Sequence, residues 1–400
     1  MVLGSTYKLV DPKFVPPTNE EEAPTEGIYI SIGQALRAGE GTIVIMPGVY
    51  EETLMLTDGH RLLSLMSAKE VLEGEEDLPV VNEEETQQVV ICGMSFHTIS
   101  IFGGAEVTGV TVRQRGPGSW FAVLCCSGAS KLERCDIDGA TNSCVGIVGD
   151  ASPTLSECRI HGSFTACGVC AFDGGQGTLS KCSIYWNALS GVEVAGEGTE
   201  LRLEENEIKS NRRDGVLVLA SASCKLVDNK ILRNFHSGVE VREGGTVEAS
   251  GNQVKWNNYG VLVCKQGKCK LENNEIFGNF VTGVEISECG EEEEGGGGGV
   301  PELITNNISC NLEAGLKIWY KGGAKLEKNT LNCNMEEVKI SPRSKKRSDM
   351  GEMAEDQPRY GVISSGFGSN VVRELKTVLH PPPPREEDPT LGVEGEEESE

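Results

Sequence analysis

The chain has 400 residues, 50 of them glycine and only 5% aromatic, and carries a formal net charge of −25 at pH 7. This composition argues against a helical bundle and favours many tight turns between short strands. Such a negative charge would repel nucleic acid, and no apolar stretch approaches the ~18 residues that a membrane span needs. We therefore expect no nucleic acid partner and no membrane partner.

Residues 1–26 are polar, and we predict a disordered N-terminal tail there. The start of the chain shows no apolar stretch of the kind that a secretory signal carries, and the number of cysteines, 15, is odd. We therefore expect reduced thiols and a location in the cytoplasm or the nucleus.

The next segment predicts one or two helical turns over residues 31–39, a strand over 42–46 and a turn over 47–51. A short amphipathic helix at this point would cover the open end of a stacked core. We therefore expect a short N-terminal capping helix.

A unit of roughly 23 residues recurs from about Gly109 to about Ile340. Three rows of positions mark it. The first row holds a glycine before a short apolar strand, at Gly146, Gly168, Gly191, Gly215, Gly238, Gly260, Gly283 and Gly315. The second follows the pattern L-x-x-[C/N]-x-I, with the bracketed position at Cys135, Cys158, Cys182, Asn206, Asn229, Asn252, Asn274, Asn306 and Asn329. The third lies five residues further on, at Asn187, Asn211, Asn234, Asn257, Asn279, Asn311 and Asn334.

One step of the repeat, from Gly283 to Gly315, is lengthened by the acidic and glycine-only run 291–299. Removing that run restores the period in both rows, so we predict a loop extruded between strands. We place the repeat domain at 27–340. The remainder, 341–400, is predicted to be a mostly disordered tail with a helix at 369–380, where apolar residues have helical spacing.

Alternation of apolar and polar residues predicts the strands. In Gly191-Val-Glu-Val, Val192 and Val194 point one way and Glu193 points the other. Burying the aliphatic side chains of one coil stabilises it by about 10 kcal/mol, whereas ordering its ~23 residues costs about 1–2 kcal/mol each. A coil cannot fold alone, so we predict an all-β protein in which about ten coils share one core.

The inward Asn and Cys positions are predicted to be structural. An Asn at the same turn of every coil can adopt the left-handed conformation and can hydrogen-bond with the Asn above and below it. Cys135, Cys158 and Cys182 take the same position in the earlier coils, where a small buried thiol fits.

The opening pattern I-x-x-A-L…G-T-I-V-I-x-P-G-V-Y-x-E, from Ile32 to Glu51, resembles the start of pectin-lyase-like right-handed β-helix proteins. The runs 152–160 and 203–216 are similar to the β-helix region of eukaryotic F-box proteins, although no F-box is visible. The resemblance covers about residues 27 to 340. It implies a single-stranded right-handed parallel β-helix with three parallel sheets and, from the F-box proteins, substrate recruitment to ubiquitin ligases.

Two outward positions on each of two adjacent coils are the catalytic candidates: Asp136 and Asp138 on one coil, Arg159 and His161 on the next. Four titratable groups within stacking distance could perform acid–base chemistry on a sugar. The alternative is charge compensation across a wet sheet face. The residue set of the polygalacturonases is not found, which favours the alternative.

The candidate binding residues are two aromatics before the third-row Asn and an outward stripe beside the glycine row; they are Trp186, Trp256, Glu193, Leu217, Glu240, Leu262 and Glu285. Exposed leucines separated by acids would form an amphipathic strip for a peptide or a partner domain. Cys167 and Cys170 match C-x-x-C but lie on a strand, so we take them as structural and predict no metal site and no cofactor.

Two functions remain open. We favour a non-enzymatic scaffold that binds protein partners, with substrate recognition in ubiquitin ligation as its extension. The alternative is a carbohydrate-binding or polysaccharide-cleaving protein, which convergence of Asp136, Asp138, Arg159 and His161 in a groove would favour.

Overall fold

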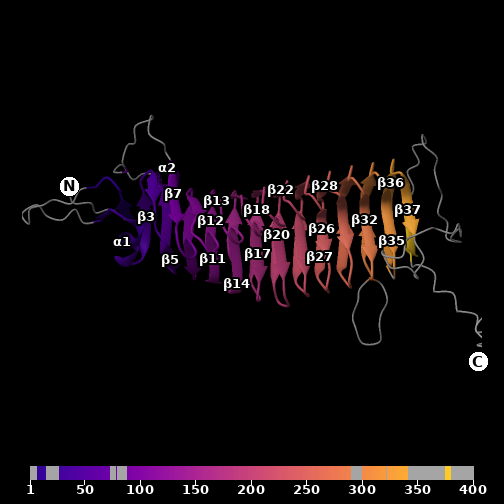
Figure 1. Cartoon of the computed structure of the whole chain (residues 1–400), viewed down its shortest axis with the longest axis horizontal. Helices are drawn as coiled ribbons and strands as arrows, with labels where there is room; N and C mark the ends of the chain where they lie inside the picture. The colour runs from indigo at the N-terminus through magenta and orange to yellow at the C-terminus, as the bar shows by residue number, and fades with distance from the viewer. Residues whose placement is uncertain are drawn as a thin grey trace, which may run out of the picture.

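The structure is a computed structural model, and it describes residues 7–14, 27–72, 78, 88–289, 300–320, 322–340 and the strand at 374–379. It is a parallel β-solenoid of about 13 coils stacked along one axis (Figure 1). The predicted all-β right-handed parallel β-helix is thereby confirmed. The number of coils exceeds the predicted ten because the less regular segments before Gly109 also stack in register. Neither helix in the described ranges has the length and apolar character needed to cross a membrane.

Three parallel ladders of strands run along the stack. The first contains β1 (Tyr7–Val10), β3 (Gly41–Ile45), β6 (His60–Ser64), β9 (Glu106–Thr108), β12 (Lys131–Glu133), β15 (Thr154–Ser156), β18 (Gln176–Ser180), β21 (Glu200–Glu204), β24 (Ser223–Val227), β27 (Thr246–Ser250), β30 (Lys268–Glu272), β33 (Glu302–Ile304) and β36 (Ala324–Asn332). The short β2 (Ile28–Tyr29) pairs with β1.

The second ladder contains β4 (Gly48–Tyr50), β7 (Val89–Gly93), β10 (Thr111–Gln114), β13 (Asp136–Asp138), β16 (Arg159–His161), β19 (Ser183–Tyr185), β22 (Glu207–Lys209), β25 (Lys230–Leu232), β28 (Gln253–Lys255), β31 (Glu275–Phe277) and β34 (Asn307–Ser309). It joins the first ladder at β36, which is long enough to pair with both β33 and β34.

The third ladder contains β5 (Leu54–Thr57), β8 (Ile99–Phe102), β11 (Val123–Gly128), β14 (Val145–Ala151), β17 (Val169–Phe172), β20 (Val192–Ala195), β23 (Val216–Leu219), β26 (Ser237–Val241), β29 (Tyr259–Val263), β32 (Thr282–Ser287), β35 (Ala314–Trp319) and β37 (Glu336–Ile340). One strand from each ladder makes one coil, and the inward side chains of all three share a continuous apolar core.

Buried asparagines stack from coil to coil, as predicted. Both the backbone N–H and the side-chain Nδ2 of Asn211 donate to Oδ1 of Asn234, at 3.1 and 3.0 Å. The left-handed conformation, however, is not adopted by the Asn. It falls on the residue before it, as at Glu205 (φ 54°) and Ser210 (φ 55°). The preceding residue turns the chain, and the Asn then points inward, where its amide satisfies buried backbone groups.

The glycine row lies where one coil approaches the next. A Cβ added at Gly215 would lie 2.5 Å from Cγ2 of Ile231 and 2.6 Å from the carbonyl oxygen of Gly238. Those distances leave no room for a methyl group. The repeated glycine is therefore required by the close packing of the third ladder against the second.

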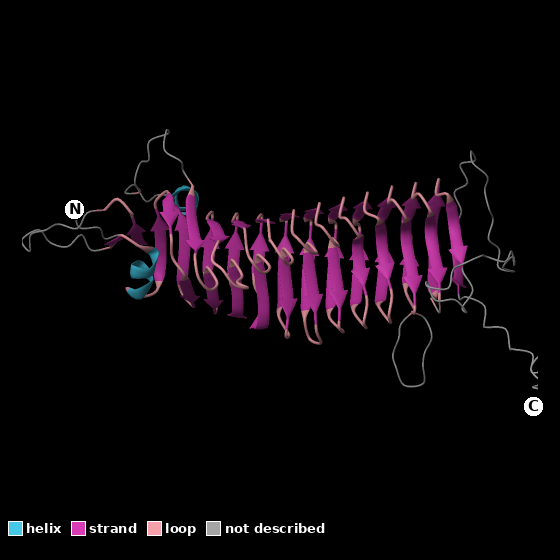
Figure 2. Ribbon diagram, in the orientation of Figure 1, coloured by secondary structure: helices cyan, strands magenta, loops and turns pink. Residues whose placement is uncertain are grey.

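The N-terminal end of the stack carries the two helices (Figure 2). The predicted capping helix is found as α1 (Ile32–Arg37), with Ile32 buried in the core. The Glu52 carboxylate accepts hydrogen bonds from the N–H groups of Ile32 and Gly33, at 2.9 and 2.7 Å. A second helix, α2 (Leu65–Val71), was not predicted; its Leu65 and Ala68 cover a small separate core.

Both predicted tails differ from expectation where the structure describes them. Residues 7–10, predicted to be disordered, form β1, whose Tyr7 and Val10 are buried. The predicted helix 369–380 contains instead β38 (Glu374–Leu379), which pairs antiparallel with β36. The terminal strands of a sheet leave backbone groups unpaired, and an added strand satisfies them. Apart from 11–14, which follow β1, the remaining residues of both tails lie outside the described residues.

The predicted loop 291–299 also lies outside the described residues. The coils on either side of it are stacked without a change of register, since β30 pairs with β33 and Nδ2 of Asn274 donates to Oδ1 of Asn306 at 3.0 Å.

Candidate functional site

The four catalytic candidates lie side by side on the outward face of the second ladder. The pairing of β13 with β16 sets Asp136 opposite Arg159 and Asp138 opposite His161. On the next coil, β19 sets Tyr185 beyond His161. The four residues are therefore neighbours, because the repeat period places outward residues of successive coils in columns.

Asp136 is the centre of this group. Its Oδ1 lies 2.9 Å from Nε2 of His161, and its Oδ2 forms an ion pair with Arg159. Burial would raise the pKa of the Asp136 carboxyl, but the hydrogen bond with His161 and the positive charge of Arg159 outweigh that effect and hold the pKa below its usual value. Asp136 is therefore a carboxylate at neutral pH, and its hydrogen bond orients the His161 imidazole.

Asp138 has a different partner. Its two carboxylate oxygens accept from Nε and Nη2 of Arg113, both at 2.7 Å. This bidentate pair occupies the carboxylate, and Asp138 is buried. Asp138 therefore holds its coil to the coil of Arg113. This is the charge compensation that we considered for all four residues.

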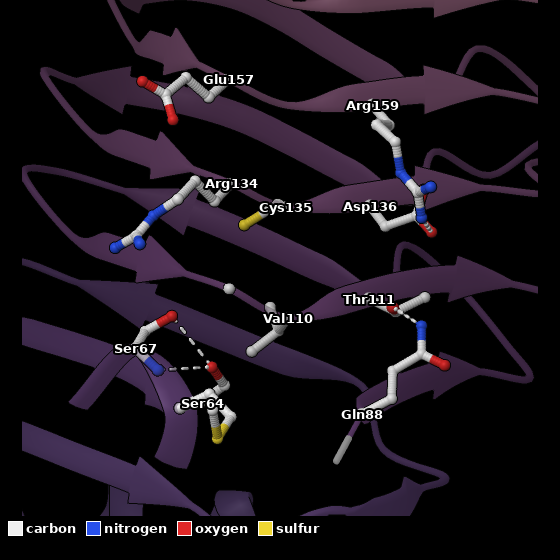
Figure 3. A pocket seen from close by; sticks show the side chains of 12 residues that line it. Ser64, Ser67, Gln88, Val110, Thr111, Arg134, Cys135, Asp136, Glu157 and Arg159 are labelled. Atoms are coloured by element: carbon white, nitrogen blue, oxygen red, sulfur yellow. Dashed lines mark hydrogen bonds and ion pairs between the residues drawn. The ribbon is translucent and has the colours of Figure 1, made fainter. Parts of the chain in front are cut away.

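A solvent-open groove of about 520 Å³ borders the group on one side (Figure 3). Its lining includes Asp136 and Arg159, whose side chains point toward each other, together with Arg134, Glu157, Gln88 and Thr111. On the other side, the ring of His161 stacks on that of Tyr185, with centroids 4.7 Å apart and planes inclined by 13°. The site thus combines a flat aromatic surface with charged hydrogen-bonding groups.

Arg113 and Tyr185 were missed by the sequence reasoning. Both lie in the column of Asp138 and His161, one coil before and one coil after. Applying the repeat period in both directions from Asp138 would have found them.

The outward stripe of candidate binding residues is aligned as predicted, since Glu193, Leu217, Glu240, Leu262 and Glu285 pair in register on consecutive coils. Its predicted exposure is wrong. Leu217 is only 1% exposed and Glu240 only 4%.

Neighbouring side chains lie against this row. Nε of Arg242 lies 3.5 Å from Oε1 of Glu240, and Nε1 of Trp319 donates to Oε1 of Glu285 at 2.9 Å. Three of the five residues, Leu217, Glu240 and Glu285, are buried, and Glu193 and Leu262 are half-buried, so the stripe is not an exposed amphipathic strip.

Trp186 and Trp256 are both exposed and both in the left-handed conformation, three coils apart. Trp186 meets the edge of Tyr185, with ring centroids 5.2 Å apart. Trp256 lies under the guanidinium of Arg233, whose Cζ is 5.1 Å from the ring centroid. Only Trp186 adjoins the candidate site.

The C-x-x-C pair is unsuited to redox chemistry. Burial raises the pKa of the Cys170 thiol to about 12, and burial together with the charge of Glu193 raises that of Cys167. The Cys167 thiol donates to Oε2 of Glu193 at 3.3 Å. Neither sulfur is a thiolate at neutral pH, which is the form that redox exchange requires.

Comparison with known proteins bears on the fold. Residues 97–254 and 237–345 match the family described as right handed beta helix region. No curated protein matches the chain. Among solved structures, the mannuronan C-5 epimerase AlgE6 A-module of Azotobacter vinelandii is similar, with a TM-score of 0.55, 14% identity, and coverage of 77% of this chain and 90% of that one.

Two further solved structures match at lower TM-scores. They are the periplasmic alginate epimerase AlgG (TM-score 0.45, 13% identity, 75% of this chain and 76% of that one) and the pectate lyase Pel9A (TM-score 0.36, 13% identity, 84% and 78%). At such identities the likeness shows the fold alone. The family match, in contrast, spans more than half of the chain, and with the parallel coils described above it establishes that this chain belongs to the right-handed β-helix family.

Proposed function

We propose that the outward face formed by β13, β16 and β19 binds a polysaccharide, with the Asp136–His161 pair positioned against a bound sugar unit. The observation that carries this proposal is the stacking of His161 on Tyr185 directly beside the Asp136–Arg159 ion pair and the open groove. Sugar rings present a flat apolar face together with hydroxyl groups, and the site offers an aromatic surface together with donors and acceptors.

The AlgE6 A-module, a similar structure that is named a mannuronan C-5 epimerase, supports the same class of ligand. The function that we favoured from the sequence, a scaffold for protein partners, has no such support. The sequence alternative, carbohydrate binding or polysaccharide cleavage, is therefore the better interpretation of this site.

The chemistry available to the site is proton transfer. The Asp136 carboxylate orients the His161 imidazole through its hydrogen bond, and an imidazole held in this way can act as a general acid or base toward a bound sugar. A sugar unit bound beside the stacked His161–Tyr185 pair would bring its hydroxyls to that imidazole.

The test is binding of the whole chain to a glycan array and to immobilised pectin, alginate and glucans. We expect Tyr185→Ala to weaken binding roughly tenfold, the effect of about 1.4 kcal/mol of lost stacking. Phe277→Ala is the matched control, because Phe277 stands in the same column of the second ladder far from Asp136. Equal losses in both variants, or no binding to any polysaccharide, would overturn the proposal. Release of products that stops in His161→Ala but not in Phe277→Ala would add cleavage to binding.

A second function, binding of a protein partner, is favoured by a row of exposed apolar residues. Phe235, Phe280, Leu312 and Met335 each follow a third-row Asn, and Phe235 is 73% exposed and Phe280 57%. Affinity capture should use Phe280→Asp and Leu312→Asp, because both side chains are exposed. Leu217, a candidate from the sequence, is buried, so its replacement would disturb the fold and would not test binding. Recovery of ubiquitin-ligase subunits that is lost in both variants would support the ubiquitin role that the F-box resemblance implies. Capture unchanged in both variants would exclude this row.

A further inference from the structure

A second cluster of titratable groups lies on the third ladder, one to two coils beyond β19, the last strand of the candidate site. Asp214 ends the turn before β23, His236 lies one coil later just before β26, and Glu240 points outward from β26. Nδ1 of His236 lies 2.8 Å from Oδ1 of Asp214 and 3.6 Å from Oε2 of Glu240. The three side chains therefore offer one ligand atom each, and these atoms all lie within 4.8 Å of one another.

Three further groups contact the carboxylate of Asp214 and fix its orientation. Its Oδ2 accepts from Oγ of Ser190 at 3.3 Å and lies 3.2 Å from Nε of Arg213, and the backbone N–H of Ser237 donates to its Oδ1 at 3.0 Å. Asp214 is fully buried. These contacts fix the direction in which Oδ1 faces His236, as outer partners do for the ligands of a metal ion.

Glu240 supplies an independent observation. The residue is more than nine-tenths buried, and its Oε2, which faces His236, has no hydrogen-bond partner among the described residues. Leu217 and Leu262 flank it in register on the neighbouring coils. An unsatisfied carboxylate oxygen between apolar neighbours is costly, and a cation placed against it would remove that cost.

We propose that Asp214, His236 and Glu240 bind a divalent transition-metal ion, with zinc as the best fit. Bonds of roughly 2.0–2.2 Å in a tetrahedral site separate the ligand atoms by about 3.3 Å, close to the two His236 distances. One imidazole nitrogen with two carboxylates suits zinc better than calcium, which takes six to eight oxygens.

The site is open on one side, since the His236 side chain is 40% exposed. Three protein ligands leave a fourth position for water, which is the arrangement of zinc sites that act on a ligand rather than those that only stabilise a fold. Nε of Arg242 lies 3.5 Å from the other oxygen of Glu240, Oε1, so the ion would bind Oε2. The ion would neutralise both carboxylates and replace the proton that His236 shares with Asp214.

The experiment uses the whole chain, freed of metal with a chelator and then dialysed against Zn²⁺ or Co²⁺ in the presence of a thiol reductant. We expect one ion per chain, a Co²⁺ spectrum without a thiolate charge-transfer band, and a higher melting temperature with Zn²⁺. Glu240→Gln, which keeps the shape of the side chain, should weaken binding on the order of 100-fold.

His161→Ala is the matched control, because His161 also pairs with a carboxylate but has Arg159 there in place of a second acid. It should leave ion binding unchanged. If Glu240→Gln fails to fold, the partly exposed His236→Gln provides the same comparison. Binding that shows only the thiolate band, or that is unaffected by the replacement of Glu240 and of His236, would overturn the site.

Discussion

Asn206 donates two hydrogen bonds to one oxygen atom of Asn229. Its backbone N–H and its side-chain Nδ2 both donate to Oδ1 of Asn229, at 2.9 and 3.0 Å. Nδ2 of Asn229 in turn donates to the carbonyl of Leu203 at 2.8 Å and to Oδ1 of Asn252 at 3.0 Å. Each amide is therefore used fully, accepting twice and donating twice inside the core. The row stacks the coils in one direction and with one register.

Replacing Asn229 by alanine should be strongly destabilising. The change leaves two donors of Asn206 and the Leu203 carbonyl without these partners in a buried place, where each lost partner costs about 1–3 kcal/mol. We expect the free energy of unfolding, measured by urea denaturation, to fall by about 4 kcal/mol. Asn258→Ala, which removes one hydrogen bond at a more exposed turn, should change it by less than about 1 kcal/mol. Similar losses in the two variants would contradict the role of the row.

The glycine row gives a second stability prediction. Gly215→Ala should lower the free energy of unfolding by about 1–3 kcal/mol, because the added Cβ meets the Ile231 side chain and the Gly238 carbonyl. The matched control is Gly104→Ala, where the nearest atom would lie 3.3 Å away in the Asp58 side chain. Thermal denaturation of both variants checks the prediction. A Gly215→Ala protein as stable as the control would show that the coils can separate at no cost.

Two histidines should titrate on opposite sides of the usual pKa of 6.5. The hydrogen bond with Asp214 raises the pKa of His236, whereas burial lowers that of His97, which lies between the rings of Trp120 and Phe121. Proton NMR of the imidazole signals in metal-free protein, assigned with His236→Gln and His97→Gln, measures both values. Equal pKa values for the two would contradict the structure.

The same shifts set the pH dependence of stability. The stability that His236 contributes is present below pH 6.5 and is lost as the pH rises through its raised folded-state pKa. The contribution of His97 has the opposite sign: it is present above pH 6.5 and is lost as the pH falls through the lowered pKa. The stability of the wild type relative to His236→Gln should therefore decrease with rising pH, and relative to His97→Gln it should increase.

Replacing Asp136 and replacing Asp138 should have different effects on affinity and stability, although the two residues are only two positions apart in the sequence. Asp138→Ala removes the bidentate pair with Arg113 and should lower the free energy of unfolding by about 2 kcal/mol, with a smaller loss in Asp138→Asn. We expect polysaccharide affinity to be unchanged in Asp138→Asn and reduced in Asp136→Ala. Calorimetric unfolding together with a binding isotherm checks both statements. Loss of affinity in Asp138→Asn to the same extent as in Asp136→Ala would assign both residues to the ligand.

Contacts that point into the core can be predicted from the sequence, whereas contacts across the outer face cannot. The repeat period, the short strands and the inward row of Asn206, Asn229 and their equivalents follow from the sequence, because inward positions recur with one residue type per slot. The same period brings Asp136 and Asp138 against Arg159 and His161, since parallel in-register coils place equivalent residues side by side.

What the tertiary structure alone decided is how side chains lie across the outer face and at the ends. Leu217 is buried, Asp138 pairs with Arg113, and Glu240 faces His236 and Asp214. Side chains from adjacent coils and adjoining turns lie against positions that strand alternation marks as exposed. β1 and β38 form at the ends of the stack because a terminal strand has unpaired backbone groups with which another segment can pair. This pairing depends on the finished sheet and not on the local sequence.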